Sequence, residues 1–301
     1  MARRRKGEPI HGWILLDKPL EMSSAQAVAR VKHLFHAAKA GHAGTLDPLA
    51  TGMLPIALGE ATKTVPFIMD GRKTYSFTLH FGHETTTDDA EGTPTRQVEK
   101  IPRASEIIDE LPNFQGQIQQ IPPAFSAIKK NGERAYELAR AGENVELEPR
   151  QVEIYELKFL NLEGQKAQFE VLCGKGTYVR ALGRDLARAL GAAGHITSLR
   201  REDVGPFRRE SMISLEKLTD LAHKTTGPEG LNSALRPLQT ALDDIPALAL
   251  SEVDAARLAQ GQSIRSGNVH QGTMLAMFAD KPVALVEANG MNLEPRRVFN
   301  L

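Results

Sequence analysis

Residues 41–63 read GHAGTLDPLATGMLPIALGEATK, and this stretch departs furthest from the patterns of regular secondary structure. Its four glycines permit backbone angles that other residues resist, while Pro48 and Pro55 fix φ and remove backbone donors. The stretch is therefore a poor helix and a poor strand. We predict an irregular loop that the rest of the fold holds in place.

One aspartate, Asp47, lies inside this loop, five residues after His42. Pro48 biases Asp47 away from the helical region of backbone space. Two interpretations follow from these residue types. In the first, the loop presents a reactive carboxylate beside a second titratable group, as loops on rigid scaffolds often do. In the second, the loop is a surface turn in which Asp47 accepts hydrogen bonds from nearby backbone N–H groups.

The composition is that of an ordinary soluble globular protein, with 41% hydrophobic and 25% charged residues among 301. This length predicts one large domain, or one large and one small. No run of 18 apolar residues is present and no apolar segment follows the basic N-terminus, so we expect neither a membrane span nor a secretory signal. A single cysteine, Cys173, rules out an intrachain disulfide and fits a reducing compartment, so we expect a cytoplasmic protein.

Charge is balanced over the whole chain, with 37 basic and 37 acidic residues, but it is unevenly distributed. The segment from Gly174 to Arg209 contains eight basic residues against three acidic ones. Such a local surplus predicts a basic surface that binds phosphate groups. The alternative is a set of solvated helix faces.

Periodicity predicts alternating helices and strands around the loop. Tyr75 shares a face with Phe77, Leu79 and Phe81 in the clearest strand, at 73–82. Further strands are expected at 151–161, 166–173 and 195–201, helices at 24–38, 62–69, 104–111, 177–191 and 214–223, and a loop at 83–100. We therefore predict an α/β (α+β) fold: a mixed, mostly antiparallel central sheet with flanking helices and a cleft, plus a small C-terminal β domain at 247–301.

Several common chemistries lack their sequence signatures. His, Cys, Asp and Glu show no zinc-ligand spacing, and neither a Gly-x-Gly-x-x-Gly nor a Gly-x-Ser-x-Gly motif is present. The run Gly174-Lys175-Gly176-Thr177 lacks the earlier glycine of a Walker loop. We expect no metal and no cofactor. Two options remain: a catalyst built on a single carboxylate, or a non-catalytic module that binds RNA or protein.

Four motifs in order make the chain recognisable. Gly41-His42-x-Gly44-x-Leu46-Asp47-Pro48-x-Ala50-x-Gly52 resembles the catalytic signature of the TruB family of tRNA pseudouridine synthases, of the bacterial stand-alone type. The resemblance is dense over about residues 10–209 and loose in the tail. It continues through Gly59-Glu60-Ala61-Thr62-Lys63 with Lys73-Thr74-Tyr75, through Pro122-Pro123-x-x-Ser126-Ala127-x-Lys129, and through Gly174-Lys175-Gly176-Thr177-Tyr178-Val179-Arg180 with Leu199-Arg200-Arg201.

The resemblance implies an enzyme that isomerises uridine 55 in the T loop of tRNA to pseudouridine, without a cofactor, on a base flipped out of its stack. By the same resemblance Asp47 is the catalytic aspartate and Arg180 pairs with it. Tyr75 lies against the target base, and His42 supports the flipped-out RNA. The remaining pocket residues that the resemblance implies are Tyr178 and Leu199.

The resemblance also implies the organisation of the chain. Residues 1–9 form a basic flexible tail, residues 10–246 a catalytic domain with a thumb-like RNA-binding insertion at about 122–149, and residues 247–301 a PUA-like RNA-binding domain. The implied partner is the T arm of tRNA. We expect a monomer with no membrane association and no obligate protein partner.

Two other functions stay open. The chain could be a non-catalytic RNA-binding or tRNA-folding protein of the same fold, which an intact Asp47, Tyr75 and Arg180 disfavour. It could also be a guide-RNA-dependent pseudouridylase subunit, although the insertion at 124–149 favours the stand-alone form. The chemical role of Asp47 stays open as well: it could add to the base, attack C1′ or remove a proton from the ribose.

Overall fold

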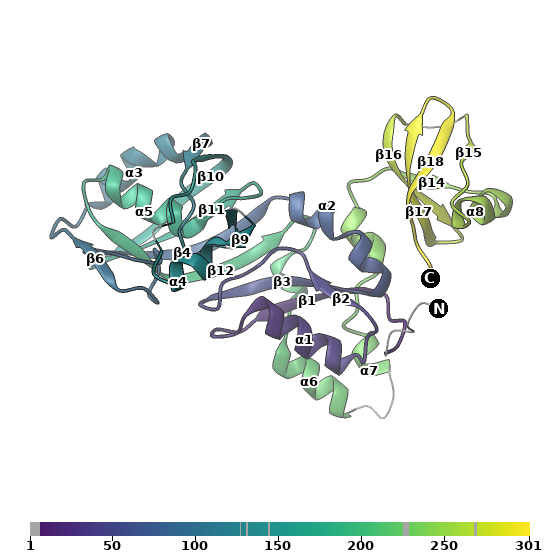
Figure 1. The fold of residues 1–301 in the computed structure, drawn as a ribbon, viewed down its shortest axis with the longest axis horizontal. Coiled ribbons are helices and arrows are strands. Elements are labelled where there is room, and N and C mark those ends of the chain that lie inside the picture. Colours follow the sequence, from purple (N-terminus) through teal and green to yellow (C-terminus); the bar gives the residue numbers. More distant parts are fainter. Residues whose placement is uncertain (1–6, 127, 131, 144, 225–228, 268–269) are drawn as a thin grey trace.

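The structure is a computed structural model, and it describes residues 7–126, 128–130, 132–143, 145–224, 229–267 and 270–301. Most of the predicted basic tail, residues 1–6, lies outside the described residues. Two β-sheets organise the chain, a large central one and a smaller C-terminal one (Figure 1). No helix in the described part of the chain is long and apolar enough to cross a membrane.

The central sheet has nine strands. In spatial order eight of them are β13 (Ile213–Ser214), β1 (Gly12–Lys18), β3 (Ala50–Leu58), β12 (Gly194–Val204), β4 (Lys73–Phe81), β11 (Lys166–Cys173), β10 (Arg150–Glu163) and β7 (Gly116–Gln120), while β2 (Ala40–His42) pairs with β3. The β1–β13 and β3–β12 pairs are parallel and the others named here are antiparallel. The predicted fold class, with a mixed and mostly antiparallel central sheet, is confirmed.

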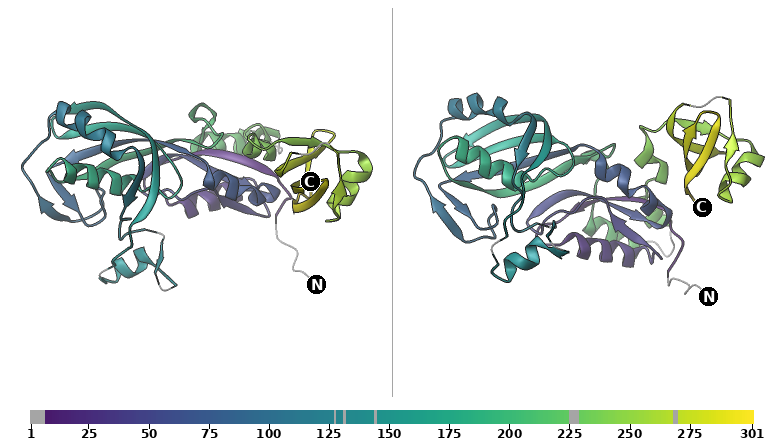
Figure 2. Two further views of the ribbon diagram at one scale, coloured as in Figure 1. Left: turned by 90° about the horizontal axis from the view of Figure 1, so that it is seen from above. Right: turned by 45° about the horizontal axis from the view of Figure 1, so that its top comes forward.

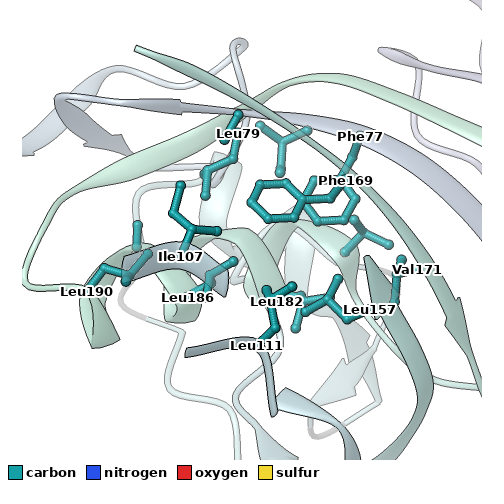
Figure 3. Packing of buried hydrophobic residues seen from close by; sticks show 14 of the residues in the cluster. Phe77, Leu79, Ile107, Leu111, Leu157, Phe169, Val171, Leu182, Leu186 and Leu190 are labelled. Carbon is teal, nitrogen blue, oxygen red and sulfur yellow. The ribbon is translucent and has the colours of Figure 1, made fainter. Parts of the chain in front are cut away.

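Helices cover the two halves of this sheet. Under β1 and β3 lie α1 (Ser24–Leu34), which ends earlier than predicted, and α6 (Leu215–Lys224) (Figure 1). On the other half, α5 (Val179–Ala189) and α3 (Ala104–Glu110) pack against β4, β10 and β11. Figure 3 shows this second core, in which the rings of Phe77 and Phe169 stack with centroids 5.0 Å apart. The shorter helical segments are η1 (Gly59–Lys63), α2 (Val65–Asp70), η2 (Leu111–Phe114), η3 (Arg209–Ser211), α7 (Glu229–Asn232) and η4 (Leu238–Leu242).

The second half of the predicted irregular loop is a buried strand, β3, so the prediction of a loop across 41–63 is wrong there. One edge of β3 pairs with β1 along its length, whereas the other edge pairs with β12 at residues 50–52 and with β2 at residues 56–58. Pro55 lies in the gap between these two partners, and its carbonyl accepts a hydrogen bond from the Ala43 N–H at 2.9 Å. A missing N–H breaks no ladder bond at this position, so the strand tolerates proline.

Another predicted loop, at 83–100, contains a two-stranded hairpin of β5 (His83–Thr85) and β6 (Pro94–Gln97). Its connecting turn includes Asp88 with a positive φ of 61°, a conformation that aspartate adopts more readily than most residues. The connection is buried at Thr87, Asp88 and Asp89. Because a short polar hairpin leaves little apolar alternation, its strands were missed from the sequence.

The segment after β7 projects from the sheet. It contains β8 (Lys129–Lys130), β9 (Glu133–Arg134) and α4 (Ala135–Arg140). Figure 2 shows α4 standing away from the layers of the central sheet. This projecting segment coincides with the predicted insertion at about 122–149.

The smaller sheet has the order β14 (Ala247–Ala249), β16 (Gly272–Phe278), β17 (Lys281–Asn289), β18 (Asn292–Val298) and β15 (Ile264–Arg265). The helix α8 (Glu252–Ala259) packs on it through the buried Leu258. A two-residue turn, Ala279-Asp280, joins β16 to β17 with φ values of 46° and 63°, which suits the twist of a tight hairpin. The sheet lies at one end of an elongated molecule (Figures 1 and 2).

Candidate functional site

A cavity of about 580 Å³ opens on the central sheet beside the segment that joins β2 to β3. It is bounded by residues 44–50, by β4 and β12, and by the segment 174–180 that leads into α5. Five of the six predicted site residues line it: Asp47, Tyr75, Tyr178, Arg180 and Leu199. The structure therefore brings together side chains from four separate parts of the sequence.

Asp47 and Arg180 form an ion pair in this cavity, with 2.9 Å between Asp47 Oδ2 and Arg180 Nε. The aspartate keeps 40% of its side-chain surface exposed, whereas the arginine keeps 5%. A buried guanidinium holds the carboxyl group in place on one side, and the open side leaves that group accessible. A single carboxylate held in this way can act as a nucleophile or as a general base.

Arg180 is held in place by groups from two other segments. Its Nη1 donates to the Thr87 carbonyl at 2.7 Å, and its Nη2 donates to the Phe125 carbonyl at 2.9 Å. Asp89 adds a second carboxylate 3.6 Å from Nη1. The hairpin connection and the projecting segment therefore fix the direction of the guanidinium, which leaves Nε for Asp47.

Tyr75 and Leu199 enter the cavity because of strand register. Leu199 of β12 is paired with Ala50 of β3 on one side and with Phe77 of β4 on the other. Tyr75 lies two residues before Phe77 on β4, and burial raises the pKa of its phenol. An aromatic ring and a branched aliphatic side chain thus lie beside the carboxylate, which suits a planar ring as ligand.

Tyr178 is the N-terminal flanking residue of α5, so this helix begins two residues later than the predicted residue 177. The side chain of Gln120, at the end of β7, accepts from the Tyr178 N–H at 2.8 Å and donates to its carbonyl at 3.1 Å. The Thr177 hydroxyl instead donates to the Gly174 carbonyl at 3.0 Å. A buried glutamine from a distant strand therefore sets the backbone two residues before Arg180.

His42 is the one predicted site residue that does not line the cavity. It lies on β2, paired with Ile56 of β3. Burial lowers the pKa of its imidazole and the charge of Arg201 lowers it further, while the backbone of Gly44 opposes both effects.

Sequence reasoning missed two buried lysines, Lys18 and Lys73. Lys18 is fully buried at the end of β1, and its ammonium donates to the carbonyls of Pro19, Met22 and Pro48 at 2.8, 2.7 and 3.3 Å. Burial lowers its pKa to about 8, with Asp47 opposing the shift. Burial likewise lowers the pKa of Lys73, which lines the cavity, to about 8. The available signal for Lys18 was a lysine two residues after the apolar run Trp13–Leu16, in the pattern of a central strand.

Arg201 was missed as well. It lines the cavity from β12, where strand alternation places it on the same side as Leu199. The strand period of two therefore contained the signal. The sequence interpretation counted Arg201 in a basic cluster and in the motif Leu199-Arg200-Arg201, but gave it no role in the cavity.

The predicted basic surface at 174–209 is largely absent as a free surface. Arg180, Arg184 and Arg201 are buried. Arg188 pairs with Glu84, and Arg200 with Asp17 through two contacts of 2.9 Å. The surplus of charge therefore mainly holds the hairpin, the strands and the cavity wall together.

Within the described residues, no group of three or more His, Cys, Asp or Glu side chains is arranged to hold a metal ion. Three histidines, His80, His83 and His195, do lie close together, with ring centroids 4.4 to 6.2 Å apart. His195 Nδ1 lies 2.9 Å from the His83 carbonyl oxygen, which makes these rings part of the packing between β4, β5 and β12.

Comparison with known proteins places the chain in a family. The model of the TruB family pseudouridylate synthase N-terminal domain matches residues 32–179, and that of the tRNA pseudouridylate synthase B C-terminal domain matches residues 180–243. The chain is 54% identical over 304 residues to the tRNA pseudouridine synthase B of Bradyrhizobium diazoefficiens, which covers 99% of this chain and 88% of that protein. It is 50% identical to the protein of that name from Caulobacter vibrioides, with both chains covered completely.

Solved structures agree in fold. A crystal structure of a Cbf5-Nop10-Gar1 complex contains a chain that superposes with a TM-score of 0.75 at 27% identity, over 96% of this chain and 85% of that chain. A structure of an H/ACA RNP bound to a substrate RNA gives 0.76 at 24% identity, over 100% of this chain and 92% of that one, and it supports the fold alone. The family models and full-length relatives carry the assignment: the chain belongs to the TruB family of pseudouridylate synthases.

Proposed function

We propose that this protein is a stand-alone tRNA pseudouridine synthase that isomerises uridine 55 in the T loop of tRNA, with Asp47 as the catalytic carboxylate. The reaction breaks the N1–C1′ bond, turns the uracil and joins C5 to C1′. The C5 proton leaves and N1 gains one, so the product is an isomer of the substrate. No electron or group carrier takes part.

The observation that carries this proposal is the ion pair between Asp47 and Arg180 at the cavity. A reaction at C1′ of a nucleotide needs one ionised group that is both accessible and held in direction. The 2.9 Å contact supplies the direction, and the exposed side of the carboxylate supplies the access. Three roles for Asp47 fit this geometry equally: addition to the base, attack at C1′ and removal of a ribose proton.

The remaining cavity residues suit a flipped uridine. The ring of Tyr75 and the aliphatic side chain of Leu199 offer apolar surface to a base, and Tyr178 and Arg180 line the same cavity. A base can reach Asp47 only after it leaves its stack, and RNA loops splay their bases most readily. His42, outside the lining, would act on the RNA around the flipped nucleotide rather than on the base.

The organisation of the chain follows from the same proposal. Residues 10–246 form the catalytic domain, the segment at about 122–149 grips RNA, and residues 247–301 form a PUA-like RNA-binding domain. Phe125 and Ser126 connect the projecting segment to the cavity, since Phe125 bonds Arg180 and Ser126 lines the wall. The partner is the T arm of tRNA, and the protein acts in the cytoplasm as a monomer with no obligate protein partner.

The test uses an unmodified tRNA transcript and maps pseudouridine at nucleotide resolution. Wild type should modify position 55 alone, and Asp47→Asn should bind the transcript with unchanged affinity but form no pseudouridine. Asp109→Asn, an exposed aspartate of α3, is the matched control and should keep full activity. Wild type that binds tRNA without modifying it would favour the non-catalytic RNA-binding alternative. A requirement for added guide RNA would favour the subunit alternative.

A further inference from the structure

Arg201 is almost completely buried beneath the segment that carries Asp47, with 1% of its surface exposed. Its Nε donates to the Met53 carbonyl at 2.7 Å, its Nη2 to the Gly44 carbonyl at 3.0 Å, and its Nη1 to the Thr45 carbonyl at 3.4 Å. Two of these acceptors precede Asp47 in the chain and one follows it. A single side chain therefore holds both ends of the segment that presents the carboxylate.

The backbone of this segment is shaped around Arg201. Gly44 has a φ of 98°, and a Cβ there would lie 3.3 Å from Arg201 Nη1. Gly52 has a φ of 95°, and a Cβ there would lie 2.2 Å from the Arg201 carbonyl oxygen. Both glycines permit an approach that a side chain would prevent. The approach at Gly44 involves the Arg201 side chain itself, whereas the approach at Gly52 involves the backbone of β12.

Arg201 also lies beside Tyr75, which lines the cavity from β4. It is paired with Tyr75 across the β12–β4 ladder and with Gly52 across the β12–β3 ladder. The charge of Arg201 and its hydrogen bond to the phenol act to lower the pKa of Tyr75, although burial raises that pKa overall. One guanidinium therefore contacts the carboxylate segment on one side and the tyrosine strand on the other.

We propose that Arg201 is a positioning residue for catalysis, which sets the distance and orientation between Asp47 and Tyr75. It acts through backbone carbonyls and through Tyr75, in contrast to Arg180, which contacts the carboxylate itself. This inference rests on the proposed function, in which Asp47 carries the chemistry.

Arginine suits this task because its planar fork presents five N–H donors in fixed directions. A lysine at the same position has one compact ammonium in place of the fork, so it cannot reproduce the separate hydrogen bonds to Gly44, Thr45 and Met53. A methionine fills similar volume without any donor. The two substitutions therefore separate the directed hydrogen bonds from the filling of space.

The experiment measures kcat and KM for Arg201→Lys and Arg201→Met on tRNA, with rates corrected for the folded fraction. We expect kcat to fall about tenfold for lysine and about a hundredfold for methionine, because small misplacements of a reacting group cost rates of this order. KM should stay within about threefold of wild type. Arg103→Lys and Arg103→Met form the matched control, because the Arg103 side chain is 81% exposed and pairs with Glu106 away from the cavity, so kcat should stay unchanged.

Equal kcat values for the lysine and methionine variants would show that Arg201 only fills space, and would overturn the proposal. A kcat within twofold of wild type in either folded variant would also overturn it. If the methionine variant does not fold, the lysine variant decides alone: a tenfold loss of kcat at wild-type KM supports the proposal. Asp47→Asn is assayed in parallel. Retained activity in that variant would defeat the proposed function, whereas an inactive Asp47→Asn with an active Arg201→Met would defeat this inference only.

Discussion

At the scale of single residues, Gly52 is the position of β3 that tolerates a side chain least. Its φ of 95° lies in the region that L-residues rarely adopt, and a Cβ would overlap the Arg201 carbonyl oxygen at 2.2 Å. Because that oxygen belongs to a neighbouring central strand, it cannot move aside without disturbing the sheet. Gly52 is therefore required both for its backbone angle and for its lack of volume.

We expect Gly52→Ala to lower the free energy of unfolding by more than the strain of a positive φ, which costs about 1–3 kcal/mol. Gly116→Ala is the control. Gly116 has a φ of 80° but open space around it, so its substitution isolates the backbone strain. Urea unfolding of both variants measures the difference, and equal losses would mean that the overlap at Gly52 is relieved without cost.

Because Lys18 is buried near Asp47, we predict that the rate of the reaction depends on pH. Burial lowers the pKa of its ammonium to about 8, and the charge of Arg201 adds to that shift while Asp47 opposes it. Below pH 8 the charged group holds three carbonyls, including that of Pro48 beside Asp47. Above pH 8 the neutral amine has lost one donor and its charge, so the Asp47 segment loosens.

The single-turnover rate of wild type should therefore fall as pH rises through about 8. The Lys18→Met variant has no titrating group at this position, so its rate should start low and show no such fall. An alkaline fall of the same midpoint in Lys18→Met would assign the titration to another group.

At the scale of elements, three arginines spaced by four residues form one face of α5, as their spacing predicts. This face docks the hairpin of β5 and β6 rather than facing solvent. Arg184 Nη1 lies 2.8 Å from Asp88 Oδ2, and Arg188 donates to both carboxylate oxygens of Glu84. The hairpin and the helix therefore act as one unit that supports Arg180.

Glu84 gives this unit a pH-dependent stability. Its hydrogen bonds from Arg188, with those from Arg96, hold the pKa of the carboxyl below its usual range, despite burial. A lowered pKa in the folded state contributes stability above the unfolded pKa of about 4.3, and that contribution is lost as pH falls through the folded value.

We expect Glu84→Gln to lower the free energy of unfolding at pH 7 by about 1.5–3 kcal/mol, the range for hydrogen bonds to a charged group. The gap between variant and wild type should shrink below about pH 4.3. Chemical unfolding at several pH values measures both quantities. A gap that stays constant from pH 7 to pH 3 would show that the charge of Glu84 contributes nothing.

At the scale of the whole molecule, the two sheets meet through a contact that combines a shared apolar core with hydrogen bonds between polar groups. Trp13 and Leu15 of β1 share a core with Leu275, Leu285 and Phe299 of the C-terminal region. Around it, Lys63 donates to the Val298 carbonyl at 2.7 Å, and Glu60 accepts from the Asn300 N–H at 2.9 Å. The motif at 59–63 therefore joins the C-terminal sheet to the central one, some distance from Asp47 in the fold.

Lys63→Met should loosen this contact without reaching the cavity. If the C-terminal sheet binds RNA as proposed, KM for full-length tRNA should rise several-fold while kcat at saturation stays unchanged. An isolated T-arm stem-loop, which is too small to engage both sheets, should show no change in KM. Lys158→Met, a surface change on β10, serves as the control, and an equal KM increase in that variant would remove the role assigned to Lys63.

The sequence alone determined those strands and helices in which buried side chains recur at a regular spacing along the chain. The strand at 73–81 and the helices α3 and α5 follow from side-chain period over a few residues. The motif around Asp47 likewise indicated a catalytic carboxylate and its family. These features lie in contiguous residues, which is why reading along the chain found them.

Beyond the expected pair of Asp47 and Arg180, only the tertiary structure decided what the buried charged groups contact. Pro55 can lie in a strand because two different strands, β2 and the remote β12, share one edge of β3 and leave a gap between them at this residue. Arg201 is buried because backbone carbonyls of the remote residues Gly44, Thr45 and Met53 accept its hydrogen bonds. Lys18 is buried because the remote Pro48 carbonyl joins the nearby carbonyls of Pro19 and Met22 as an acceptor. A charged side chain looks the same in sequence whether it is solvated or buried. Its burial depends on acceptors that come close only when the whole chain has folded.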